Sequence, residues 1–386
     1  MKCTVWTSVF LLAAAGACAQ GVDQGPKNAP GFEPEFPLQT RAPAMQSGVQ
    51  MTVEEIVTGL DTPWGVAVLP EGGYLVTERP GRLRLIRDGR MGDPISGVPE
   101  VLAQRQGGLL DVALAEEFDE SRVVYLTYAK PVSGGTSATA AARGVLSADG
   151  TALTEVADIF VQDPPSPNAM HYGSRVVPAG EVVYVTTGEH FSLKERVYAQ
   201  DTDTTHGKVV RLKHRGGAAE GNPFGNEVWS LGHRNIQGAD LRADGTLWTL
   251  EHGPAGGDEL NRITAGANFG WPEVSYGVNY DGSPVGSGNP RAEGFTEPRY
   301  YWDPVIAPGG FVFYDGEMFA HWQGDVLAAS LNPGGLVRLT LDGDTVVGEE
   351  RFLEGDMRVR DVEVDHDGAI LILDGGDGRL LRLTPQ

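Results

Sequence analysis

The stretch LGHRNIQGADL, residues 231–241, places three polar side chains directly ahead of a short alternating apolar run. These side chains are His233, Arg234 and Asn235. An arginine grips a carboxylate with a forked set of donors and stabilises an oxyanion that forms during a reaction. A histidine takes up a proton near neutral pH. The stretch therefore indicates a site for a flat anion with carbonyl oxygens, if other groups of the chain converge on it.

A second candidate stretch is TLEHGPAGGDELNRI, residues 249–263. Gly253 and Pro254 predict a tight loop with exposed carbonyl oxygens, and Glu251, Asp258 and Glu259 add carboxylate oxygens around it. Ca²⁺ prefers such oxygen ligands, backbone carbonyls included. A Gly-Pro loop beside acids is also a common turn, and no His or Cys spacing suggests zinc.

The elements that must position these residues repeat along the chain. An alternating strand, a turn with Asp or Gly, and a second strand return six times, often followed by a third strand rich in Arg and Leu. The repeats open at Trp64, Leu109, Gly173, Gln237, Gly309 and Arg360. Sheet-sized units at intervals of 45 to 72 residues are typical of a β-propeller. The 53 glycines and 25 prolines fit a chain with many tight turns.

The predicted fold class is all-β, a six-bladed β-propeller of four-stranded antiparallel blades over residues 49–386. The last repeat has only three strands before Gln386, while MTVEEIVTGL, which starts at Met51, is a spare strand. We expect this N-terminal strand to complete the last blade and close the ring, which hides an open sheet edge. The alternative is a chain of two β-sandwich domains.

In a propeller the first strand of each repeat lines the central channel, so the residues just before these strands meet at one mouth. The residues at these positions are Trp64, Gln106, His171, the triplet 233–235, Pro308, Arg358 and Arg360. Any one of them is compatible with an ordinary salt bridge or strand cap. Their equivalent places in different repeats favour a shared cationic site.

The first 19 residues carry one lysine, an apolar stretch and small residues before Gln20, the pattern of a secretory signal peptide. We expect a periplasmic or secreted protein. Both cysteines, Cys3 and Cys18, lie in this segment, so cleavage after Ala19 leaves none. If Cys18 instead carries a lipid, the protein is a lipoprotein, and only then do we expect it at a membrane. Residues 20–48 are rich in Pro and Gly and predict a flexible leader.

The formal net charge is −22 at pH 7, spread along the chain. Such a field repels phosphate backbones, so nucleic acid is excluded as an expected partner. The sequence also has no P-loop, no G-x-S-x-G elbow and no dinucleotide fingerprint.

Several stretches together resemble the PQQ-dependent glucose/sorbosone dehydrogenase family, and within it the bacterial soluble aldose sugar dehydrogenases. They are LDTPWGVAVLPEGGYLVTERPGRLRLI, QGGLLDVAL, LGHRNIQG, EHGPAGGDELN, GANFGWPEVSYGVNYDGSPV, PRYYWDPVIAPGGFVFYDG and RVRDV. The resemblance runs from about residue 50 to the C-terminus. It implies a propeller that holds pyrroloquinoline quinone (PQQ) over the channel mouth through a Ca²⁺ ion. It also implies oxidation of aldose sugars to lactones, with electrons leaving to an external quinone or cytochrome.

The resemblance also implies roles for single residues. His171 matches the base that takes the proton of the anomeric hydroxyl as hydride passes to the quinone. Glu189 matches the acidic partner that orients this histidine, and Gln106 matches a glutamine near the reacting hydroxyl.

For the cofactor, Arg234 and Asn235 match the residues at the quinone oxygens, and Arg234 also stabilises the growing charge. The resemblance further implies that Arg358 and Arg360 bind the PQQ carboxylates and that the calcium takes the carbonyls of Gly253 and Pro254. Pro308 is expected beside the cofactor because of its place at the channel mouth.

One position departs from the family pattern. Better-known glucose dehydrogenases of the family have a cofactor-contacting lysine where AASLNPGGL has Asn332. The missing charge predicts weaker PQQ binding unless another cation substitutes. Two other functions remain open on a propeller, a calcium-dependent lactonase and a non-catalytic binder of glycans or proteins.

Overall fold

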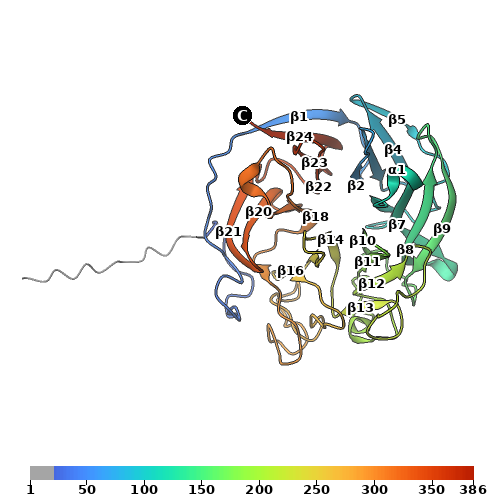
Figure 1. The fold of residues 1–386 in the computed structure, drawn as a ribbon. Helices are drawn as coiled ribbons and strands as arrows, with labels where there is room; N and C mark the ends of the chain where they lie inside the picture. Colours follow the sequence, from blue (N-terminus) through green and yellow to red (C-terminus); the bar gives the residue numbers. More distant parts are fainter. Residues whose placement is uncertain (1–20) are drawn as a thin grey trace, which may run out of the picture.

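The computed structural model describes residues 21–386 as a ring of six four-stranded antiparallel sheets around a central axis (Figure 1). The sequence prediction of a six-bladed propeller is confirmed, and no split into two β-sandwiches is seen. The predicted signal peptide, 1–19, with Cys3 and Cys18, lies outside the described residues.

Each blade takes its strands from one stretch of chain, except the last. Blades one to three consist of β2 (Pro63–Val68), β3 (Tyr74–Glu78), β4 (Arg82–Arg87) and β5 (Arg90–Pro94); β6 (Leu109–Leu114), β7 (Val123–Val132), β8 (Thr136–Leu146) and β9 (Leu153–Val161); and β10 (Gly173–Ala179), β11 (Val182–Thr187), β12 (Lys208–Lys213) and β13 (Val228–Leu231). Blades four to six consist of β14 (Ile236–Leu241), β15 (Leu247–Glu251), β16 (Asp258–Arg262) and β17 (Tyr300–Trp302); β18 (Pro308–Phe313), β19 (Val326–Ser330), β20 (Gly335–Asp342) and β21 (Thr345–Phe352); and β22 (Val359–Val364), β23 (Ile370–Asp374), β24 (Arg379–Pro385) and β1 (Met51–Thr58).

The ring closes through the N-terminal strand, as the sequence predicted. β1 pairs antiparallel with β24, from Met51 opposite Pro385 to Thr58 opposite Arg379. The first strand of each blade begins within one residue of the opening that the alternation predicted. These six strands contact one another in ring order and line the axis.

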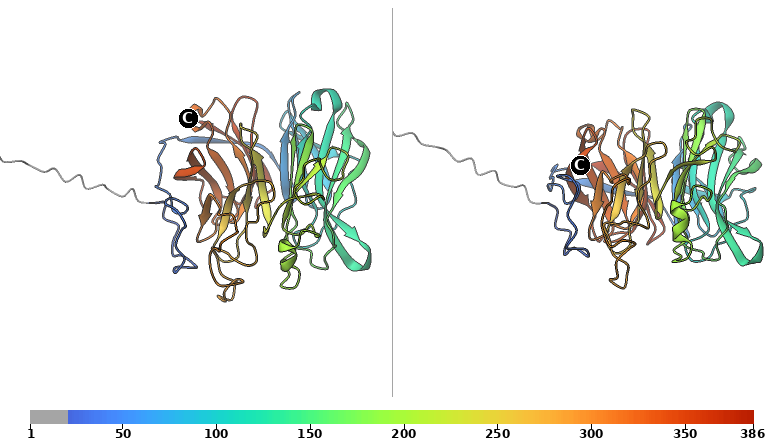
Figure 2. Two further views of the ribbon diagram at one scale, coloured as in Figure 1. Left: turned by 60° about the horizontal axis from the view of Figure 1, so that its bottom comes forward. Right: turned by 90° about the horizontal axis from the view of Figure 1, so that it is seen from below.

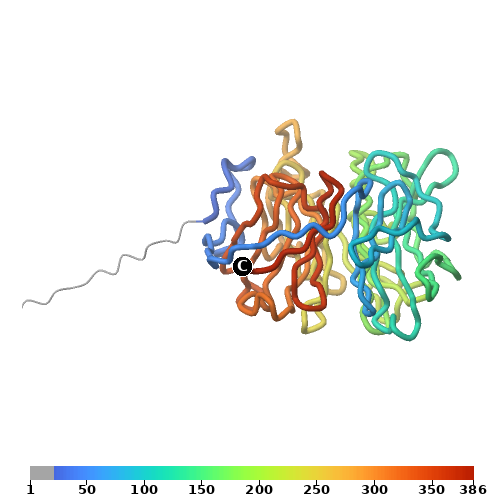
Figure 3. The backbone as a smooth tube through the Cα atoms, turned by 90° about the horizontal axis from the view of Figure 1, so that it is seen from above, coloured from blue at the N-terminus to red at the C-terminus, as the bar shows by residue number. Residues whose placement is uncertain are grey.

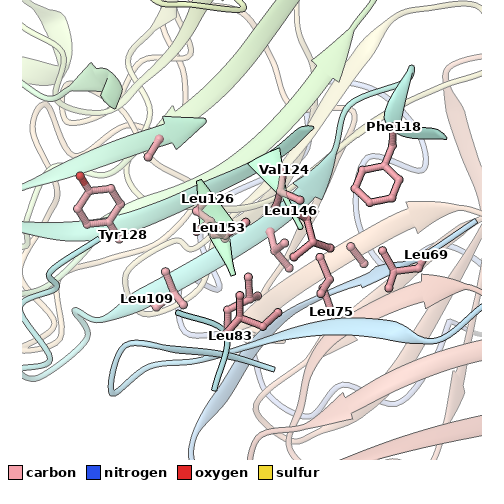
Figure 4. Packing of buried hydrophobic residues seen from close by; sticks show 14 of the residues in the cluster. Leu69, Leu75, Leu83, Leu109, Phe118, Val124, Leu126, Tyr128, Leu146 and Leu153 are labelled. Carbon is pink, nitrogen blue, oxygen red and sulfur yellow. The ribbon is translucent and has the colours of Figure 1, made fainter. Parts of the chain in front are cut away.

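Apolar side chains between adjacent blades form the core. Between blades one and two, Leu75 and Leu83 pack with Leu109, Val124 and Leu126 in one buried cluster (Figure 4). Burying one such side chain contributes about 1.5–3 kcal/mol. The repeated interfaces therefore hold the first strands, and the residues before them, in a fixed ring.

Helix is almost absent from the described chain. It consists of α1 (Phe118–Ser121) and the short 3₁₀ turns η1 (Ser133–Gly135), η2 (Arg196–Gln200) and η3 (Ala320–Trp322). None of the helices in residues 21–386 has the length and apolar character needed to span a membrane.

The segment 21–48 is packed on the propeller, whereas the sequence predicted a flexible leader. It runs beside the outer strands of blades four and five, as the blue tube of Figure 3 shows. Both carboxylate oxygens of Asp303 accept backbone N–H bonds, from Asn28 at 2.7 Å and from Ala29 at 2.9 Å. The backbone of Met45 bonds to that of Glu349 at 2.8 Å. Composition alone suggested mobility because these partners lie some 270 to 300 residues away in the chain.

Candidate functional site

The structure brings His171, Glu189 and Gln106 together ahead of the first strands. Nδ1 of His171 lies 2.8 Å from Oε1 of Glu189, and Oε1 of Gln106 accepts a 2.8 Å hydrogen bond from the backbone N–H of His171. A carboxylate only accepts hydrogen bonds, so the imidazole donates from Nδ1 and keeps the lone pair of Nε2. This nitrogen is therefore able to accept a proton.

The surroundings keep this imidazole neutral. His171 is 5% exposed, and burial, helped by the charge of Arg234, lowers its pKa well below the ordinary value of 6.5. Burial also raises the pKa of Glu189, and the same arginine partly offsets that rise. The pair thus holds a base that is unprotonated at neutral pH.

The backbone at this base is strained. His171 has φ of +46°, a left-handed conformation that a non-glycine residue rarely adopts. Opposite it, a Cβ on Gly188 would collide with the carbonyl oxygen of His171 and with Oδ1 of Asn235, so only glycine fits there. Strain of this kind concentrates at functional sites.

Arg234 is fixed at the same mouth by uncharged groups. Its Nη1 donates to the carbonyl oxygens of His252 at 3.1 Å and Gly253 at 2.7 Å, and its Cζ lies 5.2 Å from the ring centre of Trp271. Its Nε is buried without a partner. Within residues 21–386 no carboxylate lies within 4 Å of its guanidinium, so Arg234 forms no direct ion pair, and its charge acts on Glu189 and His171 over longer distances.

The other two members of the triplet serve different purposes. Oδ1 of Asn235 accepts a 3.0 Å bond from the backbone N–H of Gly173, which ties blade four to blade three beside the base. His233 is fully buried and bonds to Glu251 at 2.7 Å and to Ser230 at 2.9 Å. The placement of His233 on the rim was therefore wrong, because its ring is turned into the interior.

Two further arginines lie before and at the start of β22. Nη1 of Arg360 donates to Oε1 of Gln237 at 2.8 Å, and Nη1 of Arg358 donates to the carbonyl oxygen of Leu331 at 3.1 Å. Asn332 is exposed and directly follows Leu331, the residue whose carbonyl oxygen Arg358 binds.

His252 connects these arginines with the base. Its Nε2 lies 2.9 Å from the same Oε1 of Gln237 that Arg360 binds. Burial lowers its pKa first, and the charges of Arg360 and Arg234 lower it further, while the backbone of Pro308 acts in the opposite direction. Four residues of the predicted mouth, His171, Arg234, Pro308 and Arg360, therefore act on one imidazole.

The arginine pair is electrostatically costly as it stands. Burial, together with the like charges of Arg358 and Arg175, lowers the pKa of Arg360 to about 9. In residues 21–386 neither Arg358 nor Arg360 has a carboxylate within 4 Å. A ligand with several carboxylates would relieve both the repulsion and the desolvation, so the donor set fits PQQ.

The glycine loop after β15 has the shape that the sequence predicted. Gly253 has no room for a side chain, because a Cβ would collide with the carbonyl oxygen of Gly257. Oδ1 of Asp258 accepts the backbone N–H of Gly253 at 2.8 Å, and its Oδ2 accepts those of Ile306 and Ala307. The nearby acid thus holds the loop with its own bonds. The loop carbonyls remain as the oxygens that an ion would use.

A side-chain metal cage is not seen. Among residues 21–386 no three His, Cys, Asp or Glu side chains are arranged to hold a metal. The carbonyl of Gly253 currently accepts the Arg234 guanidinium, and Pro254 lines the adjoining cavity. Backbone carbonyl oxygens are among the ligands that Ca²⁺ accepts, so the two carbonyls are compatible with such an ion.

A cavity of about 580 Å³ opens beside Arg234 and Glu189. One wall comes from residues 191–196 after β11, and the other from residues 279–284 after β16. Both segments project from the same face of the ring in Figure 2.

The segment 164–170 lies before the first wall in the chain and supports that wall without lining the cavity. Nδ2 of Asn168 donates to the carbonyl oxygens of His190, at 2.6 Å, and of Phe191, at 3.2 Å.

Two side chains at the mouth were missed. His252 stands inside the stretch EHGPAGG but was assigned no role from the sequence. Arg79 follows β3, bonds to the carbonyl oxygen of Gly107 at 3.1 Å and adds positive charge near Arg360. Its place just after a second strand, as for Glu189 and His252, is the signal that would have found it.

Comparison with known proteins gives consistent results. A model of the glucose/sorbosone dehydrogenase family matches residues 60–382. The aldose sugar dehydrogenase YliI of Escherichia coli is 37% identical over 87% of this chain and 93% of its own. A solved glucose dehydrogenase is 42% identical, covers 86% of this chain and 99% of its own, and has a TM-score of 0.82. The PQQ-bound aldose sugar dehydrogenase of Streptomyces coelicolor is 28% identical, covers 88% of this chain and 99% of its own, and has a TM-score of 0.71.

Proposed function

Since the chain belongs to the glucose/sorbosone dehydrogenase family, we propose that it is a PQQ-dependent dehydrogenase that oxidises the anomeric hydroxyl of aldose sugars to give lactones. The observation that carries the proposal is the neutral, oriented imidazole of His171 beside a cluster of arginines that form no direct ion pair within the described chain. A base and a cationic anion site at one mouth are the two parts that this oxidation needs.

The chain's own residues would act as follows. Nε2 of His171 accepts the proton of the anomeric hydroxyl, and Glu189 stabilises the imidazolium through Nδ1. Gln106 holds the backbone of the base in place and lies where a sugar hydroxyl would approach. Arg234 places positive charge where the acceptor gains electron density.

The cofactor would lie across the same mouth. Arg358 and Arg360 would bind its carboxylates, while Arg234 and the amide of Asn235 would donate to its quinone oxygens. Bound PQQ supplies the two-electron acceptor that the protein itself lacks. A Ca²⁺ ion would take the carbonyl oxygens of Gly253 and Pro254, and Arg234 would then give up its present bond to Gly253.

Two alternatives are less well supported. A calcium-dependent lactonase needs a cage of acidic and amide side chains on the axis, and the described residues contain no such group of acids. A propeller that only binds glycans or proteins would not need a buried, neutral histidine held by a carboxylate.

The family resemblance and the N-terminal pattern support export to the periplasm or the medium, with electrons passed to an external quinone or cytochrome. Contact with a membrane would follow only if Cys18 carries a lipid.

Reconstitution tests the function. The purified apo-protein is mixed with PQQ and Ca²⁺, and reduction of a dye is followed with several aldoses. We expect activity that depends on both additions. A protein that binds PQQ but oxidises none of the sugars, or that shows no quinone absorbance at all, would contradict the proposal.

A further inference from the structure

Large apolar side chains gather at the mouth of the 580 Å³ cavity. Within residues 21–386, four of the eight exposed large hydrophobic residues lie on its two walls or on the adjoining η2 turn. They are Phe191, Leu193, Val197 and Tyr280, which are 41%, 77%, 52% and 66% exposed. Exposed apolar surface that is concentrated around a cavity indicates a binding surface.

Phe191 and Tyr280 face each other across this mouth from two different blades. Their ring centres are 6.0 Å apart. The Phe191 ring centre lies 4.9 Å from that of His171, and the hydroxyl of Tyr280 lies 3.5 Å from Nη2 of Arg234. The aromatic pair therefore borders both the base and the cationic site.

The backbone holds Phe191 in this place at a cost. His190 and Phe191 are consecutive non-glycine residues with φ of +61° and +55°. Asn168 binds both of their carbonyl oxygens, and Nε2 of His190 lies 2.6 Å from Oε1 of Gln162. A strained conformation that its neighbours fix so completely points to a function for the side chain that it presents.

The second wall is braced as well. Asn279, next to Tyr280, binds the carbonyl oxygen of Pro284 at 2.7 Å, and its Oδ1 accepts a 3.3 Å bond from Nη1 of Arg196 on the first wall. The two walls are thus connected below the aromatic rings. Both rings are preorganised to contact a ligand that reaches His171.

We propose that Phe191 and Tyr280 form an aromatic subsite that packs against the C–H face of the pyranose ring whose anomeric hydroxyl reaches His171. A pyranose carries its hydroxyls on the rim and leaves C–H groups on its faces, so it buries apolar surface against an aromatic ring. This inference rests on the proposed function, because it names the groups that bind the sugar in that reaction.

The test uses the reconstituted full-length protein and the variants Phe191→Ala and Tyr280→Ala. Both side chains are substantially exposed, so neither change removes core packing. We expect the KM for an aldose such as glucose to rise about tenfold in each variant, since burial against one aromatic face is lost. The Kd for PQQ and the KM for the dye should change less than twofold. Phe191→Tyr keeps an aromatic ring, so its KM for the sugar should equal that of the wild type.

Val197→Ala is the matched control, because Val197 is exposed on η2 but does not line the cavity. It should leave every constant unchanged. Unchanged sugar KM in both aromatic variants would overturn the subsite, as would a rise confined to the Kd of PQQ or to the KM of the acceptor. A wild-type protein without sugar oxidation would instead contradict the proposed function, and so the two failures are distinguishable.

Discussion

Within the described residues, arginines in the middle of the central channel have carboxylate partners, whereas those at its mouth do not. Below the site, Arg175 bonds to Asp111 at 2.8 Å and to Asp361 at 2.7 Å, and its Cζ lies 4.5 Å from the ring centre of Trp64. The Cζ of Arg360 lies 5.7 Å from the ring centre of the same tryptophan, but no carboxylate of residues 21–386 lies within 4 Å of this guanidinium. The same side chain is thus paired with carboxylates on the first strand of blade three and left without a described carboxylate within 4 Å on the first strand of blade six.

This difference separates structure from function. Arg175 is buried and bonds to two carboxylates, and these bonds connect blades two, three and six. Its donors are occupied, so we expect it to bind no anionic ligand. An arginine that is desolvated without an acid partner is stabilised when an anion binds to it. We therefore expect a substitution of Arg175 to lower stability, and a substitution of an arginine at the mouth to weaken ligand binding.

The largest effect is expected for Arg175→Met. It leaves Asp111 and Asp361 buried without their cation, which destabilises a protein by about 3–5 kcal/mol. Denaturant unfolding at pH 7 measures this loss. The control Arg87→Met removes an exposed arginine 3.8 Å from Glu71 and should change stability by less than about 0.5 kcal/mol.

The same substitution should be less harmful in acid. Burial raises the pKa of Asp111 to about 6, and Arg175 acts against that rise. Without the arginine the folded-state pKa rises further above the unfolded value, so the folded variant binds more protons and regains stability as the pH falls. A destabilisation that stays constant from pH 8 to pH 5 would show that the ion pairs are not its cause.

At the mouth, His171→Ala should lower turnover about 10²-fold or more, because a general base is lost. The Kd for PQQ should stay within a few-fold, since the arginines hold the cofactor. Stopped-flow turnover and cofactor titration measure the two quantities. Weakened PQQ binding with normal turnover would mean that the role of His171 is misassigned.

Glu189→Gln should lower turnover about 10- to 100-fold, the usual range for a group that orients a functional imidazole. In the wild type, burial keeps the pKa of His171 below 6.5, so we expect activity to persist below that pH. Removal of the carboxylate destabilises the imidazolium and lowers that pKa further. The acid limb of the pH profile should therefore move to lower pH while turnover falls. An acid limb that moves upward would contradict the assigned pairing.

Arg360→Gln should weaken PQQ binding about tenfold without loss of stability. In contrast to Arg175, Arg360 is repelled by Arg358 and Arg175, so its removal should leave the apo-protein equally or more stable. Titration calorimetry and denaturant unfolding of one preparation give both numbers. Destabilisation comparable to that of Arg175→Met would break the distinction between the middle of the channel and its mouth.

The repeats and the residues at the channel mouth could be predicted from the sequence, whereas the walls of the cavity could not. The alternation of apolar and polar residues identifies buried strands, so the starts of the six first strands were predicted to within one residue. The residues ahead of those strands follow from the ring itself, which is why His171, Arg234 and Arg360 were predicted to converge. Alternation says nothing about the path of a loop.

The wall and the leader depend on contacts between segments that are separated along the chain. The wall at 191–196 is set by Asn168, and the leader is held by Asp303. His233 turns inward because its Nδ1 bonds to Glu251 and its Nε2 to the hydroxyl of Ser230. None of these partners leaves a local pattern in the sequence.

The smallest expected effect is a gain in affinity for PQQ. Asn332 is exposed next to the residue whose carbonyl oxygen binds Arg358, so a lysine there adds charge to the arginines of the mouth. Asn332→Lys should tighten PQQ binding a few-fold, because an added cation near a carboxylate at a solvated position is worth about 0.2–1 kcal/mol. The gain should shrink in high salt, since exposed charges are screened. Asn332→Met has a similar length without charge and should show no gain. If both variants bind PQQ like the wild type, position 332 lies outside the reach of the cofactor, and the cationic mouth ends at Arg358.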